Sequence, residues 1–112
     1  MPQKHFNPSV SAAFREEYAD GILSFRLTGE VDHHNARALR EGMDASIISA
    51  RAKNVTIDLS GVDFMDSSGL GLILGRYTKV RECGGALSVM GASPRAAKIL
   101  HMAGVDKIMR IN

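Results

Sequence analysis

A carboxylate and two hydroxyls stand together in the stretch FMDSSGLGLILGRY, where Asp66, Ser67 and Ser68 precede an apolar run at helical spacing. A serine at the start of a helix is exposed at one end, and the unpaired N–H groups and positive dipole end behind it favour an added negative charge. A phosphoserine carries about −1.5 to −2 charges at neutral pH. Phosphate on one of these serines would therefore make this corner anionic, and it would change the binding of a partner more than the fold.

The same residues also suit an ordinary helix cap, in which Asp66 or Ser67 accepts a hydrogen bond from a backbone N–H group. Spacing alone does not decide between a cap and a modification site. Nucleophilic catalysis would need a base close to Ser67 or Ser68, and the sequence has no G-x-S-x-G elbow. It also has no G-x-x-x-x-G-K-[ST] loop, and the GLG at residues 69–71 is too short to predict a dinucleotide site. We therefore expect neither enzymatic activity nor a cofactor.

Histidine and cysteine side chains are the next candidates, because they are common metal ligands. His33 and His34 are adjacent, so on a helix they would point about 100 degrees apart, and the usual i, i+4 spacing is absent. His5, His101 and Cys83 show no ligand spacing either. We expect no metal site and interpret the two adjacent histidines as a solvated first helical turn within reach of a partner.

Composition narrows the class of protein further. The 112 residues suit one domain, and the net charge of +2 is too small and too scattered to indicate a nucleic-acid or membrane binder. Five per cent aromatic residues with no Trp argue against a stacking surface for single-stranded nucleic acid. A single cysteine, the lack of a secretory leader pattern and the absence of an apolar run long enough to span a membrane predict a cytoplasmic protein.

Strands and helices alternate around the candidate residues. Residues 1–11 are polar, contain two prolines and read as a flexible tail. A short edge strand at 13–19, a turn at Asp20-Gly21 and a strand at 22–27 predict a hairpin. Apolar residues at helical spacing then predict an amphipathic helix from Asp32, as its N-cap, to about residue 50.

The serine pair follows the next strand. The sequence NVTIDL at residues 54–59 predicts a β-branched strand, residues 60–66 a loop, and a helix begins near Ser67. Gly71 and Gly75 cost helix propensity unless something packs closely on them, so we expect a tight contact between this helix and the sheet. The apolar face of the helix is predicted to consist of Leu70, Ile73, Leu74 and Tyr77.

The last third of the chain repeats the alternation. A strand is predicted at 86–90, a helix opened by Ser93-Pro94 and ended by Gly104, and a final strand at 105–111. The resulting order, ββαβαβαβ, predicts an α/β domain with a mixed, mostly parallel sheet of four to five strands packed with helices. Ligands of such sheets tend to meet the carboxyl ends of the strands, where residues 66–69 lie. Core positions are expected for Ile99 and Leu100 and for the methionines at positions 43, 90 and 102.

Three ordered blocks of sequence resemble a known family. LTGEVDHHNARALRE (27–41), FMDSSGLGLILGRY (64–77) and GGALSVMGASPRAAKILHMAGVDKIMRI (84–111) closely resemble the anti-sigma factor antagonists of spore-forming bacteria, members of the STAS domain family. The likeness spans about residues 15–111 and implies a single STAS domain over residues 12–112. Longer members of the family imply one more helix after the last strand.

This resemblance implies a switch without enzymatic activity. The unphosphorylated form is expected to bind an anti-sigma factor that is also a serine kinase and so to release a sporulation sigma factor. The kinase would modify Ser67, with Ser68 ranking behind it, and a PP2C-type phosphatase would reverse the mark. The surface presented to the kinase is implied to contain Asp32, Asp66, Ser68, Gly69 and Leu70.

Two other classes compete with this hypothesis. The same fold serves as an accessory subunit of a lipid transporter, where no phosphate switch exists, and the hydroxyl pair of Ser67 and Ser68 favours the first hypothesis. A small nucleotide-hydrolysing enzyme would need a phosphate loop or metal ligands, and the sequence shows neither.

Overall fold

Alternating apolar and polar residues form the strands, and β3 (Ile22–Val31) is the clearest example. Leu23, Phe25 and Leu27 are buried, whereas the residues between them are exposed or half-buried. Successive strand residues point to opposite faces, so one face of β3 enters the core.

The computed structural model describes residues 3–5 and 12–112. The other elements are β1 (Gln3–His5), β2 (Ala12–Ala19), α1 (Ala36–Ala50), β4 (Asn54–Met65), α2 (Ser67–Glu82), β5 (Ala86–Met90), α3 (Pro94–Met102), the 3-10 helix η1 (Val105–Lys107) and β6 (Arg110–Ile111).

The described strands form one six-stranded sheet in the order β1-β2-β3-β4-β5-β6. The pairs β1–β2 and β2–β3 are antiparallel, and the three pairs from β3 to β6 are parallel. This confirms the predicted α/β class with a mixed, mostly parallel sheet. The additional strand is β1, which lies within the predicted tail at residues 1–11 and makes β2 an inner strand instead of the predicted edge. Residues 1–2 and 6–11 of that tail lie outside the described residues.

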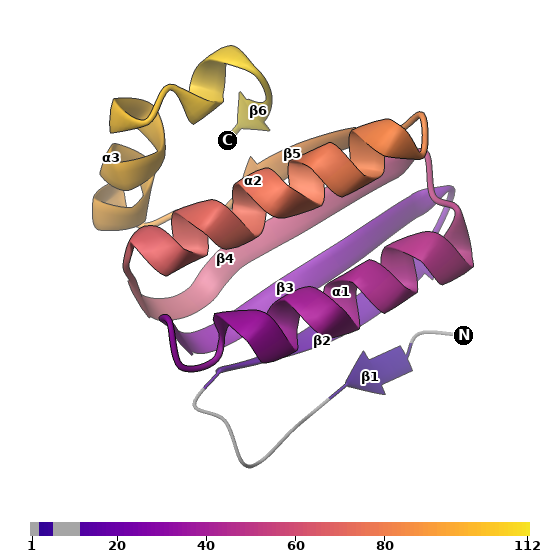
Figure 1. Cartoon of the computed structure of the whole chain (residues 1–112), viewed down its shortest axis with the longest axis horizontal. Helices are drawn as coiled ribbons and strands as arrows, with labels where there is room; N and C mark the ends of the chain where they lie inside the picture. The colour runs from indigo at the N-terminus through magenta and orange to yellow at the C-terminus, as the bar shows by residue number, and fades with distance from the viewer. Residues whose placement is uncertain (1–2, 6–11) are drawn as a thin grey trace.

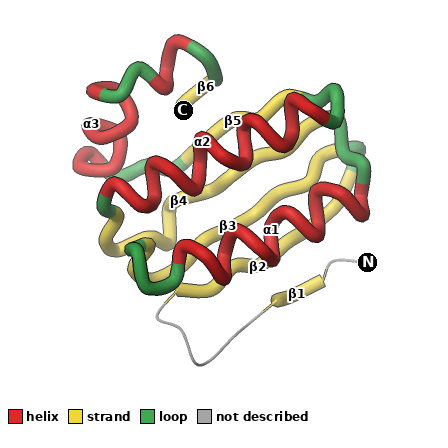
Figure 2. The backbone as a smooth tube through the Cα atoms, viewed as in Figure 1, coloured by secondary structure: helices red, strands yellow, loops and turns green. Residues whose placement is uncertain are grey.

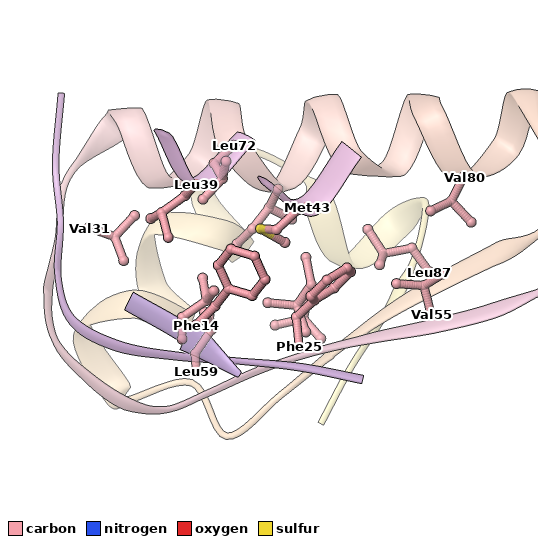
Figure 3. Packing of buried hydrophobic residues seen from close by; sticks show 14 of the residues in the cluster. Phe14, Phe25, Val31, Leu39, Met43, Val55, Leu59, Leu72, Val80 and Leu87 are labelled. Carbon is pink, nitrogen blue, oxygen red and sulfur yellow. The ribbon is translucent and has the colours of Figure 1, made fainter. Parts of the chain in front are cut away.

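Two helices cover one face of the sheet. Figures 1 and 2 show α1 and α2 side by side across it, with α3 beyond them at the end that carries β6. Between the layers, Figure 3 shows Met43 of α1 above the rings of Phe14 and Phe25. These two rings meet edge to face, with centroids 5.6 Å apart and an interplanar angle of 78°. Such pairs contribute about 0.5–1.5 kcal/mol beyond the burial of their area.

The boundaries next to the candidate residues differ from the prediction. β3 continues to Val31, residues 32–35 form a turn, and α1 begins at Ala36 with Asn35 as its N-cap, so the prediction of Asp32 as N-cap was wrong. β4 continues to Met65, where a loop over residues 60–66 was predicted. The reason is the same for both: the two strands pair with each other up to Val31 and Met65, which keeps otherwise turn-like residues extended.

The predicted close contact at Gly71 and Gly75 is also wrong. A Cβ atom added at either position would have no other group within 4 Å. Gly69 is the glycine that lies against the strands, and α2 is rotated accordingly. Its buried residues are Gly69, Leu72, Ile73, Arg76 and Val80, while Leu70, Leu74 and Tyr77 are partly buried against the core.

The carboxyl-terminal third follows the prediction at its start and departs from it at its end. β5 has the predicted bounds, and α3 begins at Pro94 with the Ser93 hydroxyl accepting a hydrogen bond from the N–H of Ala96. The predicted strand at 105–111 is instead η1 followed by the two-residue β6. Of the three predicted core methionines, Met43 is buried, whereas Met90 and Met102 are 43% and 79% exposed.

Candidate functional site

The two motifs singled out in the sequence lie next to each other. Val31 and Met65 are paired in register at the carboxyl ends of β3 and β4, and the N–H of Asp66 donates to the carbonyl of Val31 at 3.3 Å. Asp32 and Asp66 are therefore the next residues on two neighbouring parallel strands. Figure 1 shows the β3–α1 connection beside the start of α2. This is the edge of the sheet at which the sequence predicted a site.

Asp66 shapes the start of α2. It is the N-cap residue, with extended backbone angles of φ −107° and ψ −166°, and its Oδ1 accepts a hydrogen bond from the N–H of Ser68 at 2.7 Å. Its carbonyl accepts a second bond from the N–H of Gly69 at 3.0 Å. A carboxylate at an N-cap satisfies a free N–H group and complements the positive end of the helix dipole. Asp66 therefore is a helix cap, and this leaves the two serines free for another role.

The two serines differ in exposure. Ser67 is exposed, and among the described residues its hydroxyl makes no hydrogen bond. Ser68 is half-buried, and its N–H group is bound to Asp66. Of the two, the Ser67 hydroxyl is the one that another protein can reach more easily.

Gly69 lets the first turn of α2 rest on the strand ends. Gly69 is buried, and a Cβ atom there would collide with the side chain of Met65, 2.6 Å from its Sδ, and would lie 3.4 Å from Cγ1 of Val31. A Cβ atom does not lie closer than 3.0 Å to another side chain unless that side chain moves. Because Gly69 has no side chain, the helical turn that carries Ser67 packs closely on the ends of β3 and β4. The next residue, Leu70, is half-buried.

Asp32 organises the neighbouring turn. Its Oδ1 accepts hydrogen bonds from the N–H groups of His34 at 2.9 Å and Asn35 at 3.3 Å, and its carbonyl accepts one from Ala36 at 2.9 Å. Asp side chains commonly hold turns through such bonds to their own backbone. The half-buried carboxylate is thereby held in a fixed orientation at the surface.

Asn35 is a residue of the site that the sequence reasoning missed. It is only 1% exposed, its Nδ2 donates to the carbonyl of Glu30 at 2.7 Å, and its Oδ1 accepts from the N–H of Asp32 at 3.1 Å. The side chain thus ties the end of β3 to the turn that follows. Its position directly before the apolar run of α1 was an available signal, because Asn is a preferred N-cap residue.

His33 and His34 are exposed on this turn. Their rings lie with centroids 3.9 Å apart and an interplanar angle of 38°. In the part of the chain that the structure describes, no group of three or more His, Cys, Asp or Glu side chains is arranged to hold a metal ion. Within the same residues, no helix is both long and apolar enough to cross a membrane.

The fold and this site define a STAS domain. Residues 14–112 match the STAS domain family, and the chain belongs to it. Among curated relatives, the anti-sigma F factor antagonist of Paenibacillus polymyxa is 41% identical over 95 residues, which cover 85% of this chain and 81% of the relative. The corresponding protein of Lysinibacillus sphaericus is 35% identical over 84 residues, covering 75% of this chain and 72% of that one.

Solved structures agree with this assignment. The anti-sigma factor antagonist SpoIIAA in its unphosphorylated form is 29% identical and superposes with a TM-score of 0.77 over 89% of this chain and 88% of that one. The Bacillus cell fate determinant SpoIIAA in its phosphorylated form gives a TM-score of 0.71 at 29% identity, covering 89% and 91% of the two chains. The predicted fold, a single STAS-like α/β domain, is confirmed.

Proposed function

We propose that this chain is an anti-sigma factor antagonist whose unphosphorylated form binds an anti-sigma factor with serine kinase activity and thereby releases a sporulation sigma factor. The observation that carries the proposal is the exposed Ser67 hydroxyl at the start of α2, directly beside the Asp32 turn. The curated relatives are anti-sigma factor antagonists, and they support this function over that of a transporter subunit.

Ser67 is the proposed phosphoacceptor, with Ser68 behind it. A kinase must bring the hydroxyl to the terminal phosphate of ATP, so an exposed hydroxyl without an internal hydrogen bond is the better substrate. The half-buried Ser68 would have to leave its place beside Asp66. The partner surface is proposed to contain Asp32, Asp66, Ser68 and Leu70 around Ser67, with Gly69 supporting them from below.

Phosphate on Ser67 would act on the surface and leave the fold unchanged. The N–H groups of Ser68 and Gly69, which would otherwise bind an anion, are already used by Asp66. The phosphate would therefore remain a solvated dianion beside the carboxylates of Asp32 and Asp66. A partner contact shaped for the small Ser67 hydroxyl would have to make room for this dianion and strip its water, which is costly. Binding is lost for this reason.

The remaining parts of the cycle lie in other proteins. The chain is proposed to act as a binding module in the cytoplasm, with ATP hydrolysed by the kinase and the phosphoserine by a PP2C-type phosphatase. Among the described residues no base contacts the Ser67 hydroxyl, so its activation as a nucleophile is assigned to the kinase.

The test is phosphorylation with the cognate anti-sigma factor and ATP, followed by mass spectrometry of the modified residue. Ser67→Ala should keep binding and abolish labelling, and the matched control Ser68→Ala should still be labelled on Ser67. Ser67→Asp should weaken binding. Labelling of Ser68 in the unaltered chain, or equal affinity of the phosphorylated and unphosphorylated forms, would contradict the proposal. Backbone NMR shifts that spread through the sheet on phosphorylation would contradict a surface mechanism.

A further inference from the structure

Within the described residues, the strands that carry the site extend beyond the rest of the sheet. There, β2 pairs with β3 as far as Gly29, and β5 pairs with β4 as far as Asp58. In the part of the chain that the structure describes, the last register pairs of β3 with β4, Glu30 with Phe64 and Val31 with Met65, therefore form a two-stranded ribbon. Figure 1 shows this ribbon end where α1 and α2 begin. The ribbon thus continues the proposed partner surface away from the helices.

An aromatic side chain lies on the outer face of this ribbon. Met65 is buried beneath Gly69, and successive strand residues point to opposite faces. Phe64 consequently points away from α2, and it is 39% exposed. Its register partner Glu30 is exposed on the same face. An exposed aromatic side chain beside the proposed partner surface has the character of an interface anchor, because aromatic residues that become buried on binding often dominate the binding energy.

The ribbon end is negatively charged and is not neutralised from within. Glu30 lies on the ribbon, Asp63 directly precedes it on β4, and Asp32 and Asp66 directly follow it. Residues 27–36 and 59–75 contain no Lys or Arg, although the chain has a net charge of +2. Among the described residues none of these four carboxylates forms an ion pair; Asp32 and Asp66 accept bonds from backbone N–H groups only. Complementary charge on a partner steers its approach and selects against other partners.

We infer that the partner surface extends from Ser67 over the β3–β4 ribbon, where Phe64 is its apolar anchor, and that it takes a basic protein surface in which Arg or Lys side chains surround an apolar contact. This inference rests on the proposed function, because the occupant is the anti-sigma factor. Arginine suits the position best, since its guanidinium can stack on the Phe64 ring while it pairs with a neighbouring carboxylate.

The test is the affinity of the purified cognate anti-sigma factor for single variants. Phe64→Ala should weaken binding by roughly tenfold or more, as expected for an anchor residue. The matched control Met102→Ala removes another exposed apolar side chain, on α3, and should leave the affinity unchanged. Thermal unfolding of each variant separates a loss of contact from a loss of fold.

Charge variants give an independent readout that does not depend on the aromatic side chain. Glu30→Gln and Asp63→Asn should each slow association and reduce its dependence on salt, whereas Glu17→Gln on β2 should change neither. Affinities of Phe64→Ala, Glu30→Gln and Asp63→Asn equal to that of the unaltered chain, with Ser67→Asp still weakened, would overturn the inference and leave the proposed function standing. If the unaltered chain fails to bind the anti-sigma factor, both the inference and the proposed function are wrong.

Discussion

The Nε atom of Arg76 lies 2.7 Å from Oδ1 of Asp44, and this ion pair joins α2 to α1 within the helix layer. Arg76 is 4% exposed, and burial lowers the pKa of its guanidinium while the Asp44 carboxylate opposes that shift. The two atoms touch without hydrogen-bond geometry, and Nη1 of Arg76 is buried without a partner among the described residues. The attraction therefore compensates the desolvation of the guanidinium only in part.

Removing one member of this pair should cost more than replacing both. Asp44→Ala leaves a buried guanidinium without its counter-charge and should lower the free energy of unfolding by about 1–3 kcal/mol. The double variant Asp44→Ala/Arg76→Met should recover part of that loss, because no charge then remains to be desolvated. Urea unfolding of the two single variants and the double variant measures the coupling. Strictly additive losses would show that the two side chains do not interact.

Gly69 and Gly71 offer a matched comparison on one helix. Gly69→Ala places a methyl group against Met65 and should destabilise the fold by about 1–3 kcal/mol through overpacking. Gly71→Ala meets open space on an exposed helix position and should stabilise it by roughly 0.5–1 kcal/mol. Thermal unfolding measures both. Because Gly69 supports the turn that carries Ser67, its variant should also be phosphorylated more slowly, while Gly71→Ala should be phosphorylated at the normal rate.

Most element types were predictable from local patterns in this chain, whereas β1, η1 and several boundaries were not. The strand at Ala86–Met90 and the cap at Ser93 are signalled by the local sequence, and the prediction found both. The end of β4 depends on its pairing with β3, which a local pattern does not contain. Residues 60–65 look like a loop because they include Ser, Gly and Asp, yet their backbone groups are held by the neighbouring strand.

Some features of the candidate site were likewise predictable from local sequence, and others depend on the folded sheet. The position of Ser67 at a helix start was predictable, since an Asp N-cap before a run of helical spacing is a local signal. Its proximity to Asp32 follows from the register of Val31 with Met65, which only the folded sheet defines. The position of Asn35 before α1 was a local signal that was overlooked, whereas its bond to the carbonyl of Glu30 on the preceding strand is defined only by the folded sheet.

Asn35 should prove necessary for the shape of the Asp32 turn. Asn35→Ala leaves the carbonyl of Glu30 and the N–H of Asp32 without their side-chain partners and should destabilise the fold by about 1–3 kcal/mol. Arg37→Ala removes an exposed ion pair with Glu41 one turn further on and should change stability by less than about 0.5 kcal/mol. Chemical unfolding checks the difference, and faster amide exchange at residues 32–35 in Asn35→Ala would locate it. Equal stabilities would show that the turn holds without the amide.

Asp66 combines a cap with a charge, and two substitutions separate them. Asp66→Ala removes both and should lower stability by about 1 kcal/mol, as should Ser93→Ala at the N-cap of α3. Asp66→Asn keeps a capping oxygen and should leave stability nearly unchanged, because Asn and Asp cap helices about equally well. If the anti-sigma factor reads the carboxylate, both Asp66 variants should bind it more weakly by a similar factor, despite their different stabilities. Weakening confined to Asp66→Ala would instead mean that the partner needs only an ordered start of α2. Calorimetric titration of the anti-sigma factor into each variant, alongside thermal unfolding, distinguishes these outcomes.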